Sequence, residues 1–94
     1  MTAPAEFEEA AFAAIQDEIA VALPSLRDRN LSLGPLEVAR GGQGEGYASE
    51  LRTYVFRDGQ ICDALEVHMV RNGAPAFTVD ELRDWFRSQF EDLT

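Results

Sequence analysis

The chain has 94 residues, a net charge of −9 and an isoelectric point near 4.4. This charge opposes direct binding to nucleic acid or to an anionic membrane, because both are negatively charged. No apolar run approaches the roughly 18 residues of a membrane-spanning helix, and the lone Cys62 excludes an intrachain disulfide. We therefore expect a cytoplasmic protein, folded as one domain over residues 1–94, with a modest core and no deep enclosed pocket.

The charge is distributed unevenly along the chain. Residues 1–26 sum to −5, residues 80–94 sum to −3, and everything between them sums to only −1. Both acidic segments have helical periodicity, so the charge is expected on two helical faces of a near-neutral body. All eight basic residues are arginine, a composition typical of GC-rich bacterial or phage genomes.

The first helix is predicted from Pro4 to Leu23, with Thr2 as its N-cap and Pro24 as its limit. Apolar residues three and four apart indicate its core-facing side: Phe12, Ile15, Ile19, Leu23 and Leu26. On the other side Phe7, Ala14 and Val21 recur every seven residues, with Ala10 beside them. This small-residue seam would seat a second helix or a second subunit of a homodimer; the alternative is that alanine simply favours helix.

The middle of the chain predicts an antiparallel sheet. Residues 27–35 are expected to be a connection, followed by strands over 36–40, 47–57 and 61–71, with a fourth strand or a loop over 74–77. The turn signals between them are a mobile glycine-rich loop over Gly41–Gly46, Asp58-Gly59, and Asn72-Gly73.

The two long strands have faces of different character. Odd-numbered positions best fit a face covered by helices: Tyr47, Leu51, Val55, Ile61, Leu65, Val67 and Met69. A three-residue turn would pair Leu51 with Leu65 and Val55 with Ile61. The other face mixes charged residues with Tyr54, Phe56, Cys62, Ala64 and Val70. We interpret it as a contact surface for self-association or for a partner; the alternative is a moderately apolar free face.

A capping box, Thr78 to Glu81, predicts a closing helix over residues 79–92. Its core-facing residues are Val79, Leu82, Phe86, Phe90 and Leu93, with Trp85 on the flank. The element order is therefore α-β-β-β-α. The expected fold class is α+β, with a three-stranded (or four-stranded) antiparallel sheet and two helices packed on one face.

No constellation predicts catalysis, a metal site or a cofactor. Cys62 and His68 are six residues apart on one predicted strand, about 20 Å, which is too far for a nucleophile and its base. Glu66 and His68 share a strand face, but a zinc site needs three or four ligands. Gly41–Gly46 lacks the lysine and the helix N-terminus of a phosphate loop. We therefore expect a protein that is not an enzyme.

The helical acids support the sharpest functional hypothesis. Acidic columns can occupy a basic surface of a partner protein, and can imitate nucleic acid, as immunity proteins, antitoxins and phage inhibitors do. The predicted contact residues are the acids Asp80, Asp84, Glu91, Glu6, Glu9 and Asp17, with Trp85 or the Tyr54 and Phe56 face as an apolar anchor. The alternative is a solvated face, partly neutralised by Arg83 and Arg87.

Two other functional classes remain open from the sequence. One is a small assembly or secretion-chaperone-like module that binds through the apolar sheet face or the helix seam. The other is an enzyme or small-ligand carrier, which would require a pocket with converging polar groups.

Overall fold

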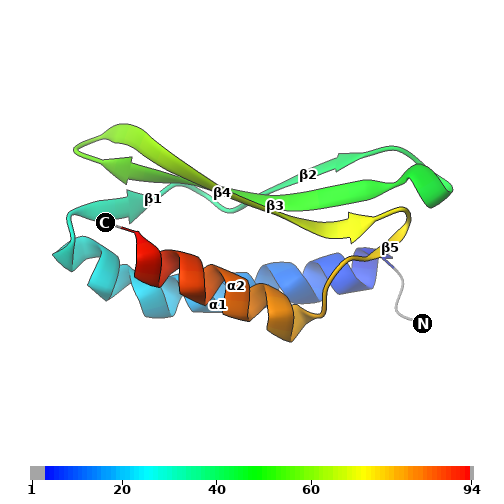
Figure 1. Cartoon of the computed structure of the whole chain (residues 1–94), viewed down its shortest axis with the longest axis horizontal. Helices are drawn as coiled ribbons and strands as arrows, with labels where there is room; N and C mark the ends of the chain where they lie inside the picture. Colours follow the sequence, from blue (N-terminus) through cyan, green and yellow to red (C-terminus); the bar gives the residue numbers. More distant parts are fainter. Residues whose placement is uncertain (1–3, 94) are drawn as a thin grey trace.

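The computed structural model describes residues 4–93 and has two layers, with both helices on one face of an antiparallel sheet (Figure 1). The elements, in chain order, are α1 (Pro4–Asp28), β1 (Leu31–Leu33), β2 (Glu37–Gly41), the 3₁₀ turn η1 (Gly44–Gly46), β3 (Ala48–Arg57), β4 (Gln60–Arg71), β5 (Ala74–Pro75) and α2 (Val79–Asp92). The predicted α+β class is confirmed. None of the described elements covers the outer face of the sheet.

β3 is the central strand and pairs on both sides. On one side it meets β4; on the other it meets β1 and β2, which lie end to end along the same edge. Gly34, between β1 and β2, still donates its N–H to the Tyr54 carbonyl at 2.9 Å, so the two pieces act as one interrupted edge strand. The predicted connection over residues 27–35 was wrong in this respect, because β1 is only three residues long and too short to show alternation.

The β3–β4 hairpin closes with a tight two-residue turn. Asp58 and Gly59 have φ values of 53° and 78°, which is the type I′ geometry, so the predicted three-residue turn was wrong. Leu51 pairs with Val67 rather than Leu65, and Val55 pairs with Asp63 rather than Ile61. The two-residue turn pairs Arg57 with Gln60, and a bulge between Val55 and Phe56 then moves the register by one further residue.

Two bulges then move side chains between faces. The register shifts once between Val55 and Phe56 and once between Ser49 and Glu50, and each shift adds one residue to β4. Ile61 therefore pairs with Phe56 and is 60% exposed, whereas Val70 is fully buried. Simple alternation predicts the reverse, with Ile61 on the face covered by helices and Val70 on the other face, because it takes no account of bulges.

α1 is longer than the sequence predicts, and a different side of the helix faces the core. It continues through Pro24 to Asp28, because a proline inside a helix removes a single backbone hydrogen bond while the buried Leu26 anchors the last turn. The predicted N-cap, Thr2, lies outside the described residues. Phe7 and Ala14 are buried in the core, so the proposed seam is not a free surface; only its other members, Ala10 and Val21, are exposed.

The core lies between the helices and the inner face of the sheet. Its central members are Ala11 and Ile15 of α1, Leu51 and Val55 of β3, Leu65 and Met69 of β4, and Leu82, Phe86 and Phe90 of α2. Of the stripe predicted for α1, Phe12 and Ile19 are only partly buried. Of the stripe predicted for α2, Leu82, Phe86 and Phe90 are buried, and Val79 and Leu93 are partly buried.

α2 is fixed at both ends by polar contacts. Thr78 and Glu81 form the predicted capping box: the Glu81 N–H donates to Oγ1 of Thr78 at 3.1 Å, and the Thr78 N–H donates to Oε1 of Glu81 at 2.9 Å. At the other end, Arg29 donates to the carbonyls of Phe90 (2.8 Å) and Leu93. A cation there satisfies the last carbonyls of the helix and complements its dipole.

Candidate interaction surfaces

The net charge is almost entirely on the helical layer. The two helices hold eleven acids and three arginines, a net −8, whereas the sheet and its loops hold six acids and five arginines, a net −1. Because both helices cover the same face of the sheet, the molecule has one strongly negative side and one nearly neutral side. The sequence showed the unequal segments, and the fold places them together.

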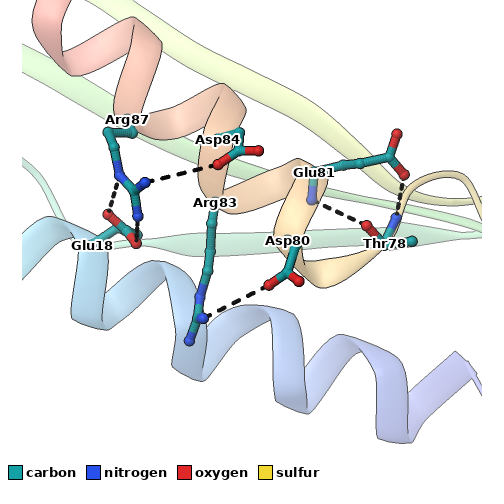
Figure 2. A network of polar contacts seen from close by, with 7 residues as sticks. All are labelled: Glu18, Thr78, Asp80, Glu81, Arg83, Asp84 and Arg87. Carbon is teal, nitrogen blue, oxygen red and sulfur yellow. Dashed lines mark hydrogen bonds and ion pairs between the residues drawn. The ribbon is translucent and has the colours of Figure 1, made fainter.

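Two of the predicted contact acids on α2 have arginine partners (Figure 2). Arg83 lies 3.8 Å from Asp80 and Arg87 lies 3.8 Å from Asp84, each at a spacing of three residues. Arg87 also reaches across to α1, where its Nη2 is 2.6 Å from Glu18. The hydrogen bond to Glu18 raises the pKa of Arg87. Asp80 and Asp84 remain 89% and 77% exposed, so these exposed pairs lower the local charge without hiding the carboxylates.

The other four predicted acids are exposed and make no ion pair or hydrogen bond among the described residues: Glu6, Glu9, Asp17 and Glu91. Three of them lie on α1. Glu91 lies at the far end of α2, beside a groove of about 490 Å³ between the two helices. Val21, which is 78% exposed, also lines this groove. The unpaired carboxylates of this set therefore lie along α1 and at the C-terminal end of α2.

Trp85 is separated from this inter-helix groove. Its ring packs edge-on against Phe86, with centroids 4.9 Å apart, and its exposed side lines a groove of about 420 Å³ between α2 and β4. Phe77, which is 42% exposed, lines the same groove. Asp84 also belongs to its rim, so here the structure joins a predicted acid with a predicted anchor.

The other predicted anchors lie on the opposite side of the molecule. Tyr54 and Phe56 are half-buried on the outer face of the sheet, and the bulge adds Ile61 beside Phe56. Further along this face Arg52 lies 2.8 Å from Glu50 and 3.2 Å from Glu66. The charge of Glu66 is the main cause that raises the pKa of Arg52. The predicted contact residues therefore form two separate surfaces.

Sequence reasoning missed a buried polar cluster around Glu8. This carboxylate is only 4% exposed; its Oε2 accepts the Tyr47 hydroxyl at 2.6 Å, and its Oε1 accepts Nε of Arg40 at 3.3 Å. Burial raises the pKa of Glu8, but the hydrogen bonds of its partners outweigh it and the pKa falls below its ordinary value. The Ser49 hydroxyl contributes to this lowering, although its geometry is outside that of an ordinary hydrogen bond. No sequence signal pointed to it, because the apolar pattern placed Phe7 and its neighbours on the side of α1 away from the core, whereas the structure buries Phe7.

The cluster borders a groove of about 710 Å³, which Glu9, Glu45 and Gly73 also line. Because the pKa of Glu8 is lowered, this carboxylate is a weak base near neutral pH and is poorly suited to act as a general base in the groove. Within residues 4–93, no group of three or more His, Cys, Asp or Glu side chains is placed to hold a metal ion.

No helix in the described part of the chain has the length and apolarity needed to cross a membrane. Comparisons with protein-family models, with curated proteins and with solved structures found no match to this chain.

Proposed function

We propose that this protein is a non-catalytic binding protein, of the inhibitor, immunity or antitoxin type, that occupies a basic surface of a partner protein in the cytoplasm. The observation that carries the proposal is the net −8 on one layer of a 94-residue chain. A one-sided field steers a positively charged partner toward the helices and speeds its association. A partner that handles nucleic acid would present such a basic surface.

The four unpaired acids are the best-placed contacts. Glu6 and Asp17 are exposed on α1, and their positions differ by about 20° around a helix with 3.6 residues per turn. They thus point in nearly the same direction and form one column. Asp80 and Asp84 follow on α2, where Arg83 and Arg87 weaken their field. We therefore expect α1 to contribute more binding energy than the α2 acids.

A matched pair of charge variants tests this proposal. A partner is first captured from the source cell and purified; its affinity is then measured by calorimetry for Glu6→Gln with Asp17→Asn, and for Glu37→Gln with Glu45→Gln. Both double variants have the same net charge, but only the first changes the helical layer. We expect the first to weaken binding at least tenfold and the second to change it little. Equal effects, or none from the helical variant, would refute the proposal.

A second candidate is an assembly or chaperone-like module that uses the outer sheet face, including as a homodimer. Its support is the exposed Ile61 beside Tyr54 and Phe56 on a nearly neutral layer. Apolar binding depends weakly on salt, whereas docking by acids weakens steeply as salt rises. Sedimentation of Phe56→Ser against the natural chain tests self-association. A dimer that persists in this variant would exclude the outer face as its interface.

A further inference from the structure

One edge of the sheet is open for most of its length. β5 pairs only with Val70 and Arg71, and the Ala76 N–H adds one hydrogen bond to the Met69 carbonyl at 2.8 Å. From Ile61 to His68, no described strand pairs with the outer edge of β4. An unpaired edge of this length is a template for an added strand.

The backbone groups that face this edge can be identified. The Ala64 N–H donates to Oδ1 of Asp63 at 2.8 Å, so it points away from β3. Because the N–H and C=O groups of one residue point the same way and alternate along a strand, Glu66 and His68 also face the open edge. Asp63 covers the first of these donors with a side chain that an added strand could displace. Acidic residues on an edge also discourage uncontrolled pairing.

The groove that contains Trp85 lies along the same edge, on the helical side. Its apolar lining includes Val67 of β4, Phe77 and Leu82, and its rim carries Glu81 and Asp84. Alternate side chains of a strand added to β4 would point to this side of the sheet, toward the groove. The remaining side chains would lie over the outer face, beside Ala64 and Glu66. Apolar residues therefore suit the groove side, and basic residues suit the outer side, where Glu66 is 45% exposed.

A second copy of this chain fits the edge poorly. Antiparallel pairing of β4 with β4 of another copy would place both α2 helices on the same side of one continuous sheet. Each α2 has a net charge of −3, and Asp84 is 77% exposed. The two helices would repel one another across the two-fold axis.

We infer that the open edge of β4 binds an extended segment of a partner protein in which apolar and basic residues alternate, by adding it to the sheet as a new strand. This inference rests on the proposed function, because it specifies how a basic partner would be held. Main-chain hydrogen bonds would supply affinity, the Trp85 groove would accept the apolar side chains, and Glu66 on the outer face would favour the basic ones.

The probe is a synthetic seven-residue peptide of alternating arginine and valine, capped at both ends and titrated into the natural chain by NMR and fluorescence. We expect shifts at the amides of Ala64, Glu66 and His68 and a change in Trp85 emission. A glutamate–valine peptide of the same length should not bind. A dissociation constant above about 1 mM for the basic peptide would overturn the inference.

Ala64→Pro tests the edge directly, because it removes an N–H that β3 does not use, and proline is tolerated on such an edge. We expect this variant to bind the basic peptide at least tenfold more weakly, whereas Ala64→Ser, which keeps the N–H, should bind it with the affinity of the natural chain. If Ala64→Pro fails to fold, a peptide N-methylated at alternate residues removes the complementary hydrogen bonds of the same ladder, those that the peptide donates to the carbonyls of β4. Equal affinity for the methylated peptide, or shifts confined to Glu6 and Asp17, would refute strand addition and leave the proposed function standing. If the matched charge variants also have no effect, both fail.

Discussion

Glu8 gives the most quantitative prediction, because it ties α1 to the end of the sheet that α2 does not reach. Replacing Glu8 with alanine removes a buried carboxylate that accepts two hydrogen bonds. The Tyr47 hydroxyl donates one at 2.6 Å and Nε of Arg40 donates the other at 3.3 Å. A hydrogen bond to a charged group contributes about 1.5–3 kcal/mol. The Arg40 side chain is 56% exposed, so solvent screening reduces its share to about 0.5 kcal/mol.

Glu8→Ala should therefore lower the free energy of unfolding by about 2–3.5 kcal/mol. For a domain of this size that corresponds to a fall in Tm of roughly 10–20 °C, which circular dichroism during heating would measure. Glu9→Ala is the matched control, because Glu9 is the exposed neighbour and should change stability by less than about 0.5 kcal/mol. A double-mutant cycle with Tyr47→Phe should show coupling. Equal losses for Glu8→Ala and Glu9→Ala would refute the assigned role of the cluster.

The same cluster predicts a pH dependence. The pKa of Glu8 is lower in the folded chain than its ordinary value of 4.5. Its contribution to stability is therefore present above pH 4.5 and is lost as pH falls through the folded value. The stability difference between the natural chain and Glu8→Gln should shrink over that window. A difference that stays constant down to pH 2 would contradict the lowered pKa.

Three further outcomes follow from the fold. Thr78→Ala removes half of the capping box and should cost about 1 kcal/mol, measured by urea unfolding, whereas Ser88→Ala at an exposed site of the same helix should cost less. Phe86→Ala empties a fully buried site and should cost about 3–5 kcal/mol; a loss below about 1 kcal/mol would contradict its central place in the core. Gly73→Ala should destabilise the chain, because φ is +77° and an added Cβ would lie 2.5 Å from the Gly44 carbonyl oxygen, whereas Gly41→Ala meets no atom within 4 Å. Equal stability of the two glycine variants would count against the contact between these turns.

Much of the fold was predictable because local signals and burial agree there. The boundaries of α2 follow from the Thr78 capping box and from apolar residues three and four apart, and the structure confirms them. The Asp58-Gly59 turn fixed the existence of the hairpin. The register depended on the length of that turn and on the bulge between Val55 and Phe56, and the apolar pattern of the sequence determines neither.

The errors have two physical sources. Bulges are tertiary features, and they moved Ile61 and Val70 to faces that strict alternation does not give them. In α1, packing outweighs local propensity, because burial of Leu26 keeps the helix intact beyond Pro24. The candidate surface was predictable only in its composition. That Trp85 shares a groove with an open strand edge depends on the short β5, which covers only the last residues of β4.

The most direct test of the central claim is the rate of association with the purified partner as a function of ionic strength. If the helical layer steers docking, the rate constant for the natural chain should fall steeply between low and physiological salt. Glu6→Gln with Asp17→Asn should flatten this dependence, and Glu37→Gln with Glu45→Gln should leave it nearly unchanged. An association rate that is indifferent to salt, or equally altered by both double variants, would contradict the claim that the acidic helices form the binding surface.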